Sequence, residues 1–195
     1  MHPDTPNVYF DERIGRLNTY LDMDIVRRWA IPALPPQRMD DLRILDIGAG
    51  KGRMTRQLAT IARLCVAIEP FPDFYKALTA MPLPSNVETH SCTFSEYTES
   101  RRERFDIIYV GGVTPYMDDR ELQEFFCSVR HILRAGGVVI NRELATKQPV
   151  ERFAGQSVIA RTPAELVKAA RDQGLSLVRT RRAYPVNIPW LVFKS

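Results

Sequence analysis

Residues 43–55 read RILDIGAGKGRMT, and this stretch decides the fold. It begins with a short apolar run from Arg43 to Ile47, continues through three glycines at alternate positions, and leads into a helical stretch over about 52–63. Glycine at a strand-to-helix turn lets the backbone approach a ligand closely, because no Cβ atom intervenes. In sheets whose strands alternate with helices, ligands bind at the carboxyl ends of the strands. The stretch therefore predicts a ligand-binding loop after the first strand.

The spacing of these glycines excludes two common phosphate-binding motifs. The dinucleotide fingerprint requires its third glycine at position 53, which is Arg53. The nucleoside-triphosphate motif G-x-x-x-x-G-K-[ST] also fails, since Arg53 lies five residues after Gly48 and Lys51 is followed by Gly52. Neither a dinucleotide nor a nucleoside triphosphate is therefore the expected ligand.

An acidic residue ends the next apolar run, which extends from Cys65 to Glu69. Glu69 lies 17 residues after Gly52, and a carboxylate at this place can accept hydrogen bonds from both hydroxyls of a ribose. Pro70 and Phe71 follow and are placed to flank an adenine ring. The pattern favours a nucleoside ligand.

Alternating strands and helices continue along the rest of the chain. Strands are expected at 43–47, 65–69, 87–92, 105–110, 138–144, 175–184 and 188–193, and helices at about 11–30, 52–63, 72–80, 119–134 and from 163 to just before Gly174. Residues 146–160 show no clear period and are expected to form a loop. This order predicts an α/β fold with a mostly parallel seven-stranded sheet, helices on both faces and a C-terminal antiparallel hairpin.

Residues 1–36 are expected to form an N-terminal helical extension, and residues 37–195 the main domain. Apolar residues recur at helical spacing up to Trp29, and Pro32, Pro35 and Pro36 end the helix. Tyr20 and its neighbours could close over a ligand as a lid. The alternative interpretation is a helix packed against the edge of the sheet.

Composition narrows the class of protein. The 195 residues suffice for one domain, and no apolar run reaches the roughly 20 residues of a membrane span. The start of the chain lacks the pattern of a secretory signal, and the three scattered cysteines favour a reducing cytoplasm without a metal site. The net charge of +4 is not gathered in one run, so a nucleic-acid partner is disfavoured.

The chain resembles the class I S-adenosylmethionine-dependent methyltransferase family. ILDIGAGKGRMT matches its glycine-rich motif and VAIEP its acidic motif, while RFDIIYVGGV and LRAGGVVI are similar to the family's fourth-strand motif and the turn before its fifth strand. The resemblance covers about residues 43–193. It implies a Rossmann-like fold and S-adenosylmethionine as the cofactor, with S-adenosylhomocysteine as its product.

The family's donor-binding roles fall on particular residues of this chain. The methionine portion is assigned to Asp46, Gly48 and Gly50, and the ribose to Glu69. Thr93 and Phe94 are offered as neighbours of adenine, and Val110 and Gly111 as neighbours of the methyl group. The full set of expected donor contacts is Asp46, Gly48, Ala49, Gly50, Glu69, Pro70, Thr93, Phe94, Val110 and Gly111.

The acceptor is expected at the ends of the fourth and fifth strands. Tyr116 and Glu143 are the candidate catalytic residues, and Tyr20, Tyr116, Asn141 and Glu143 the candidate substrate contacts. For Tyr116 the alternative is packing against the next helix, and for Asn141 and Glu143 it is surface exposure. No metal site is expected, because no histidine or acidic cluster has the spacing of metal ligands.

A small-molecule methyltransferase acting on nitrogen, oxygen or carbon is the first hypothesis. An RNA methyltransferase is the second, disfavoured because Val110-Gly111-Gly112-Val113 stands where a D/N-P-P-F/Y motif would occur. A non-catalytic protein that only binds S-adenosylmethionine is the third. The oligomeric state is left open.

Overall fold

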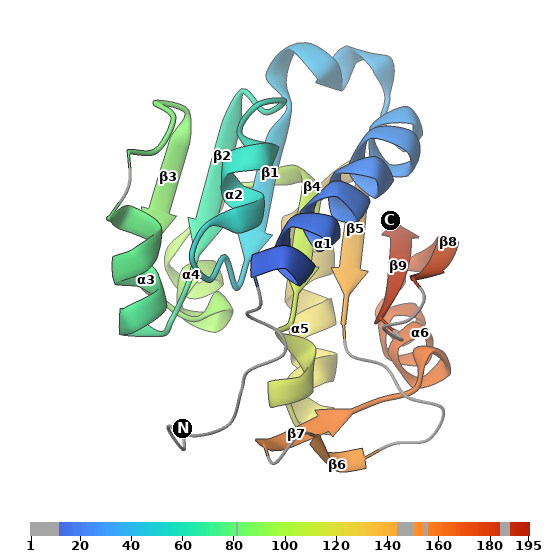
Figure 1. The fold of residues 1–195 in the computed structure, drawn as a ribbon. Helices are drawn as coiled ribbons and strands as arrows, with labels where there is room; N and C mark the ends of the chain where they lie inside the picture. The colour runs from blue at the N-terminus through green and yellow to red at the C-terminus, as the bar shows by residue number, and fades with distance from the viewer. Residues whose placement is uncertain (1–11, 81, 144–149, 154–155, 184–187) are drawn as a thin grey trace.

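A seven-stranded sheet forms the centre of the computed structural model, which describes residues 12–80, 82–143, 150–153, 156–183 and 188–195 (Figure 1). Its strand order is β3-β2-β1-β4-β5-β9-β8. The strands are β1 (Arg43–Ile47), β2 (Leu64–Ile68), β3 (Val87–His90), β4 (Phe105–Gly111), β5 (Leu133–Arg142), β8 (Ser176–Ala183) and β9 (Ile188–Lys194). The helices are α1 (Glu12–Ile25), α2 (Arg53–Leu58), α3 (Pro72–Thr79), α4 (Phe94–Ser100), α5 (Asp119–Ile132) and α6 (Pro163–Asp172).

Strand pairing confirms the expected architecture. The strands β1 to β5 of this sheet pair in parallel, whereas β9 runs antiparallel to both β5 and β8. A parallel pair needs a crossover helix, and no helix separates β8 from β9, so these two strands form the C-terminal hairpin. The chain leaves β3 at one edge and returns to β4 beside β1, which places the reversal of strand order between β1 and β4.

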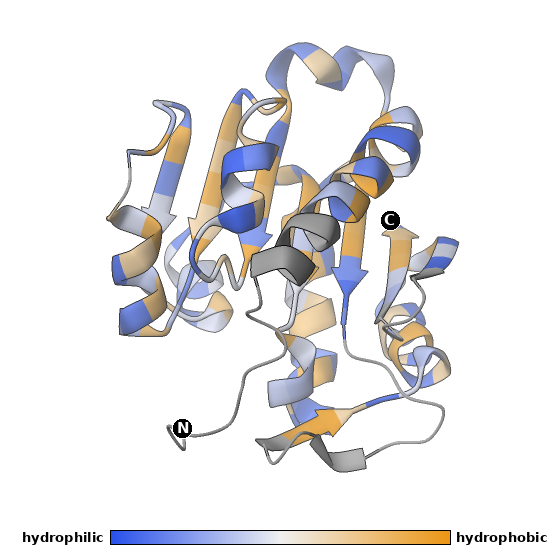
Figure 2. Ribbon diagram, in the orientation of Figure 1, coloured by the Kyte–Doolittle hydropathy of each residue, from blue (hydrophilic) through white to orange (hydrophobic). Residues whose placement is uncertain are grey.

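Helices cover both faces of the sheet, and successive strand residues point to opposite layers. In β4, Ile107 and Tyr109 join one apolar cluster with α1 and α2, while Ile108 and Val110 join another with α4, α5 and α6. Figure 2 shows the central strands as largely hydrophobic, with β5 turning hydrophilic at its carboxyl end. Burial on both faces explains why these strands are continuous apolar runs in the sequence.

Several segments differ from the sequence expectation; β5, for example, begins at Leu133 and not at residue 138, so the helix before it ends at Ile132 and not at residue 134. Within residues 146–160, the described part contains β6 (Val150–Phe153) and β7 (Gln156–Ala160), which pair antiparallel, so the expected loop was wrong there. The helix α4 was not expected; a capping box between Thr93 and Glu96 begins it. Leu144, Tyr184 and residues 1–11, which belong to expected elements, lie outside the described residues.

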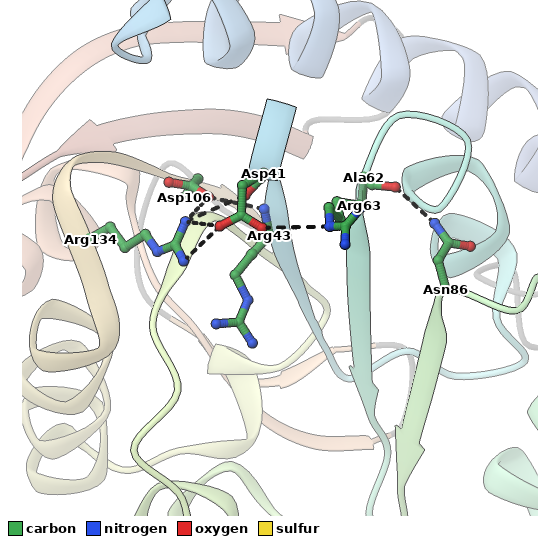
Figure 3. Close-up of polar contacts among 7 residues, drawn as sticks. All are labelled: Asp41, Arg43, Ala62, Arg63, Asn86, Asp106 and Arg134. Carbon is green, nitrogen blue, oxygen red and sulfur yellow. Dashed lines mark hydrogen bonds and ion pairs between the residues drawn. The ribbon is translucent and has the colours of Figure 1, made fainter. Parts of the chain in front are cut away.

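The expected helix over 52–63 ends early, at Leu58. The side-chain amide of Asn86 donates hydrogen bonds to the carbonyl oxygens of Ala59 (2.9 Å) and Ala62 (2.8 Å). Figure 3 shows the second of these contacts, which joins the turn after α2 to the start of β3. A distant side chain thus satisfies carbonyls that the helix would otherwise use.

The N-terminal segment packs onto the sheet. After α1 the chain continues through the short helical turns η2 (Val26–Ala30), η3 (Ile31–Ala33) and η4 (Pro36–Asp41). Met23, Ile25, Val26, Ala30 and Leu34 are buried in the same cluster as Ile107 and Val138. The division at residue 36 remains a prediction, but the burial assigns these side chains to the core. None of the described helices is long and apolar enough to cross a membrane.

Two variants distinguish whether α1 packs in the core or acts as a lid over the ligand. We expect Ile25→Ala to lower the free energy of unfolding by about 2–5 kcal/mol, because Ile25 is 1% exposed. Tyr20, 72% exposed on the same helix, is the matched control, and Tyr20→Ala should leave stability unchanged. Urea denaturation measures both. A stable Ile25→Ala variant would contradict core packing, and a loss of turnover confined to Tyr20→Ala would support the lid.

Candidate active site

Apart from Tyr20, which lies on α1, the predicted site residues lie in or after the strands β1 to β5, toward the edge of the sheet where these strands end. The pairing registers place Asp46 of β1 beside Ala67 of β2 and Tyr109 of β4. Parallel strands share their carboxyl edge, and the reversal of strand order between β1 and β4 lies in the middle of it. That reversal is where open α/β sheets bind their ligands.

Glu69 joins the loop after β1 to the loop after β2. Its Oε2 accepts a hydrogen bond from the Gly50 backbone N–H (2.7 Å), and its Oε1 accepts one from the Phe71 N–H (2.9 Å). Glu69 is buried, at 3% exposure, although Pro70 and Phe71 beside it are exposed. The carboxylate is therefore held in one orientation at the place predicted for the ribose.

Gly50 leaves open space in the glycine loop. It adopts φ +57°, a left-handed conformation that suits glycine, and a Cβ built on it would meet nothing within 4 Å. Gly48 differs, because a Cβ there would overlap the side chain of Val113 in the loop after β4. The chain thus packs tightly at Gly48 and leaves room at Gly50.

Asp46 lies under this loop and is almost fully buried. It accepts a hydrogen bond from the Thr55 hydroxyl of α2 (2.6 Å). Burial raises the pKa of the Asp46 carboxyl to about 6, although the Thr55 hydrogen bond and the charge of Arg53 act in the opposite direction. The predicted methionine-binding side chain is therefore fixed by α2.

A buried ion-pair network around Asp22 was missed by the sequence analysis. The Asp22 carboxylate accepts hydrogen bonds from Arg53 of α2 (3.2 Å) and from the indole of Trp190 of β9 (2.5 Å), and Arg142 of β5 lies 3.1 Å away. This network ties α1 to the carboxyl edge of the sheet. The sequence carried one signal for it: Asp22 directly follows Leu21 and lies three residues before Ile25, which puts an acidic side chain beside the apolar face of the first helix.

Glu143 follows β5 and faces the loop after β4. Its Oε1 accepts hydrogen bonds from the backbone N–H groups of Val113 (3.0 Å) and Thr114 (3.2 Å). Its Oε2 is buried and has no hydrogen-bond partner in the described part of the chain. Burial raises the pKa of the Glu143 carboxyl from 4.5 to about 7, against the lowering effect of the two N–H groups. One carboxylate oxygen therefore anchors the side chain and the other is unused.

The other predicted acceptor residues lie in different surroundings. Tyr116 ends the turn η5 (Thr114–Tyr116) and is 60% exposed; partial burial and then the Glu143 charge raise the pKa of its phenol. Asn141 is fully buried between Val110 and Leu191 in register, and neither polar atom of its amide has a partner among the described residues. The surface-exposure alternative therefore fails for Asn141 and Glu143, and their substrate roles remain predictions.

The predicted adenine neighbours do not form one surface. Thr93 is exposed and caps α4, whereas Phe94 is buried and packs against Phe125 of α5, with ring centroids 5.1 Å apart. Val110 is fully buried in β4 and Gly111 ends that strand. Ala49 is buried in the glycine loop. The donor contacts assigned to these residues stay predictions.

The chain matches a family model described as AdoMet dependent proline di-methyltransferase over residues 23–193. Among curated proteins, it is 28% identical to the zebrafish (Danio rerio) N-terminal Xaa-Pro-Lys N-methyltransferase 1, covering 69% of this chain and 61% of that protein. It is 26% identical to the Arabidopsis thaliana alpha N-terminal protein methyltransferase 1, covering 70% and 52%. The chain thus spans between half and two thirds of the length of these two relatives.

Solved structures share the fold. A Leishmania major S-adenosylmethionine-dependent methyltransferase superposes with a TM-score of 0.77 at 14% identity, covering 94% of this chain and 73% of that one. The Burkholderia thailandensis 1,6-didemethyltoxoflavin-N1-methyltransferase, solved with S-adenosylhomocysteine bound, gives a TM-score of 0.68 at 18% identity, covering 94% and 86%.

Proposed function

This chain belongs to the family of S-adenosylmethionine-dependent proline di-methyltransferases, and on that premise we propose that it transfers a methyl group from S-adenosylmethionine to an amine nitrogen. Family membership supports the cofactor and the type of reaction. The observation that carries the choice of acceptor is the buried Glu143 carboxylate, whose Oε2 is unused.

The residues at the carboxyl edge fit the donor. Open space beside Gly50 is bordered by the Glu69 carboxylate, and Asp46 lies at the end of the same loop. We assign the ribose to Glu69 and the methionine portion to Asp46 and Gly50. S-adenosylmethionine, when bound, supplies an electrophilic methyl group on a sulfonium that also acts as the leaving group.

The acceptor chemistry follows from the position of Glu143. Oε2 is buried without a partner among the described residues, so an uncharged amine reaches it by displacing the side chains that cover it; the amine then donates an N–H hydrogen bond to Oε2, and this contact directs the nitrogen lone pair. The lone pair forms the new N–C bond as the S–C bond breaks, and the product amine afterwards releases a proton. Orientation of this kind can supply roughly 7–11 kcal/mol of the barrier reduction. Glu143 is therefore assigned a positioning role toward the amine.

Two kinds of amine acceptor, which differ in size, are candidates: a small molecule and the N-terminus of a protein. A small-molecule amine agrees with the first hypothesis from the sequence. The α-amino group of a protein is favoured by the matched family and by the names of the zebrafish and Arabidopsis relatives. Both candidates place an amine at Glu143, so the same site serves either one.

A label-transfer assay tests the proposal and separates the candidates. Donor carrying a labelled methyl group is incubated with a peptide that begins Xaa-Pro-Lys, with the same peptide acetylated at its N-terminus, and with a set of small amines. We expect label on an amine nitrogen, located by mass spectrometry. Label on the free peptide but not on the acetylated one assigns a protein N-terminus, and label confined to small amines assigns the other candidate. Label on oxygen, carbon or RNA, or no turnover despite donor binding, would contradict an amine acceptor.

A further inference from the structure

A cavity at the opposite edge of the sheet is lined by arginines. It lies where β1, β4 and β5 begin and has a volume of about 650 Å³. Its charged lining consists of Arg38, Arg43, Arg102, Glu103, Arg104 and Arg134. Because β1 has five residues, each adding about 3.3 Å, this cavity lies roughly 16 Å from the glycine loop across the sheet. It is therefore separate from the candidate active site.

Two of the arginines are engaged by carboxylates. Arg134 donates a hydrogen bond to the buried Asp106 (3.0 Å) and pairs with Asp41 (3.3 Å), and Arg38 lies 3.6 Å from Asp106. Asp106 also accepts a hydrogen bond from the backbone N–H of Arg43 (2.9 Å). Figure 3 shows Arg134 reaching both carboxylates. These contacts fix one wall of the cavity.

Three guanidinium groups have no carboxylate partner. Among the described residues, the side chains of Arg43, Arg102 and Arg104 make no hydrogen bond or ion pair that balances their charge. In Figure 3 the Arg43 guanidinium extends away from Asp41 and Asp106. Glu103, the acidic residue of the lining, accepts a hydrogen bond from the neutral Tyr97 hydroxyl and offsets one of these three positive charges. The cavity thus retains excess positive charge at a site that is open to solvent, with Arg102 and Arg104 exposed.

We propose that this cavity binds a small anion that carries a diphosphate group. A guanidinium presents two parallel N–H donors, which match the paired oxygens of a phosphate. A volume of about 650 Å³ lies in the range of small-molecule sites, roughly 300–1,000 Å³, and exceeds what one phosphate fills. Three unpaired guanidinium groups suit two linked phosphates better than a single one.

The shape of the charged surface argues against a nucleic-acid strand. Single-stranded RNA is bound along an extended basic groove, usually with aromatic side chains on which bases stack. Here the arginines line one open depression where three strands begin, no aromatic side chain of the described residues is part of its lining, and the exposed Asp41 lies at its border. A compact anion is the better fit.

Isothermal titration calorimetry with sodium pyrophosphate tests the site on protein saturated with S-adenosylhomocysteine. We expect pyrophosphate to bind with the donor site filled, and inorganic phosphate to bind about tenfold more weakly. Arg43→Gln and Arg104→Gln should each weaken pyrophosphate binding by about tenfold. Arg63→Gln is the matched control, because Arg63 lies at the same edge of the sheet, is exposed and does not line the cavity. Its effect should stay below about twofold.

A titration with adenosine diphosphate shows whether the diphosphate group belongs to a nucleotide or is free diphosphate. Tighter binding than pyrophosphate assigns a nucleotide-like ligand, and weaker binding assigns free diphosphate; both support the site. Three results would overturn it: no heat with pyrophosphate, equal weakening by Arg63→Gln, or loss of pyrophosphate binding when S-adenosylhomocysteine is added. Tighter binding of a single-stranded RNA through the same arginines would also overturn it. Unchanged thermal unfolding of each variant without ligand shows that the fold is intact.

Discussion

Glu143→Gln should lower turnover by about 10–100-fold while the affinity for S-adenosylhomocysteine changes by less than about twofold. The substitution keeps the shape of the side chain and removes the charge on Oε2, and a hydrogen bond to a charged group contributes about 1.5–3 kcal/mol. Oε1 lies against the loop after β4 and not against the glycine loop, so donor binding should persist. Steady-state kinetics and calorimetry measure the two quantities separately.

The pH profile distinguishes positioning of the amine from a structural role. The raised pKa of Glu143, about 7, leaves its carboxyl neutral below that pH and ionised above it. The wild-type rate should therefore rise through about pH 7 as the acceptor for the amine N–H forms, and rise further as the amine itself loses its proton at about pH 8 or above. The Glu143→Gln variant should lack the first rise and keep the second. Glu165→Gln, which alters the exposed capping carboxylate of α6, should keep the wild-type profile. Normal turnover of Glu143→Gln across the pH range would remove this residue from the active site.

Gly50→Val should weaken S-adenosylhomocysteine binding by at least about 100-fold. The side chain would enter the open space beside Gly50, and a β-branched residue at φ +57° is strained by about 1–2 kcal/mol or more. Displacement of the loop would also break the hydrogen bond from the Gly50 N–H to Glu69. Calorimetry with S-adenosylhomocysteine measures the loss.

Gly174→Val is the control for backbone strain at Gly50. Gly174 adopts φ +80° after α6, and a Cβ there would have only ordinary contact with Arg130, at 4.0 Å. This variant should lose stability and keep its affinity for S-adenosylhomocysteine. Equal affinity losses in the two variants would attribute the effect to strain, and unchanged affinity in Gly50→Val would contradict the donor site.

The sequence alone determined the central sheet and pointed to the residues that we propose for the donor. The strands that are covered on both faces are continuous apolar runs, so their place in the chain is visible without a structure. Gly48 and Gly50 come directly after one strand and Glu69 directly after the next. Because the two strands are parallel neighbours, these residues lie close together at one edge of the sheet. These are local signals, since each depends on residues close together in the chain.

Tertiary structure decided the features that depend on distant partners. The end of α2 coincides with hydrogen bonds from the side chain of Asn86, 24 and 27 residues away from the carbonyls that it contacts. Asp22 is recognisable as a network centre only when Arg53, Arg142 and Trp190 surround it.

The raised pKa of Glu143 and the grouping of the unpaired arginines also depend on the tertiary structure. A glutamate after a strand is expected to be exposed, and its raised pKa arises from burial in the folded chain, which outweighs the lowering effect of the N–H groups of the loop after β4. Arg43, Arg102 and Arg104 are ordinary charged residues in the sequence. They form one cavity because parallel strands bring the starts of β1, β4 and β5 to the same edge. Burial and charge balance depend on every element packed around a group, and for that reason no short stretch of sequence encodes them.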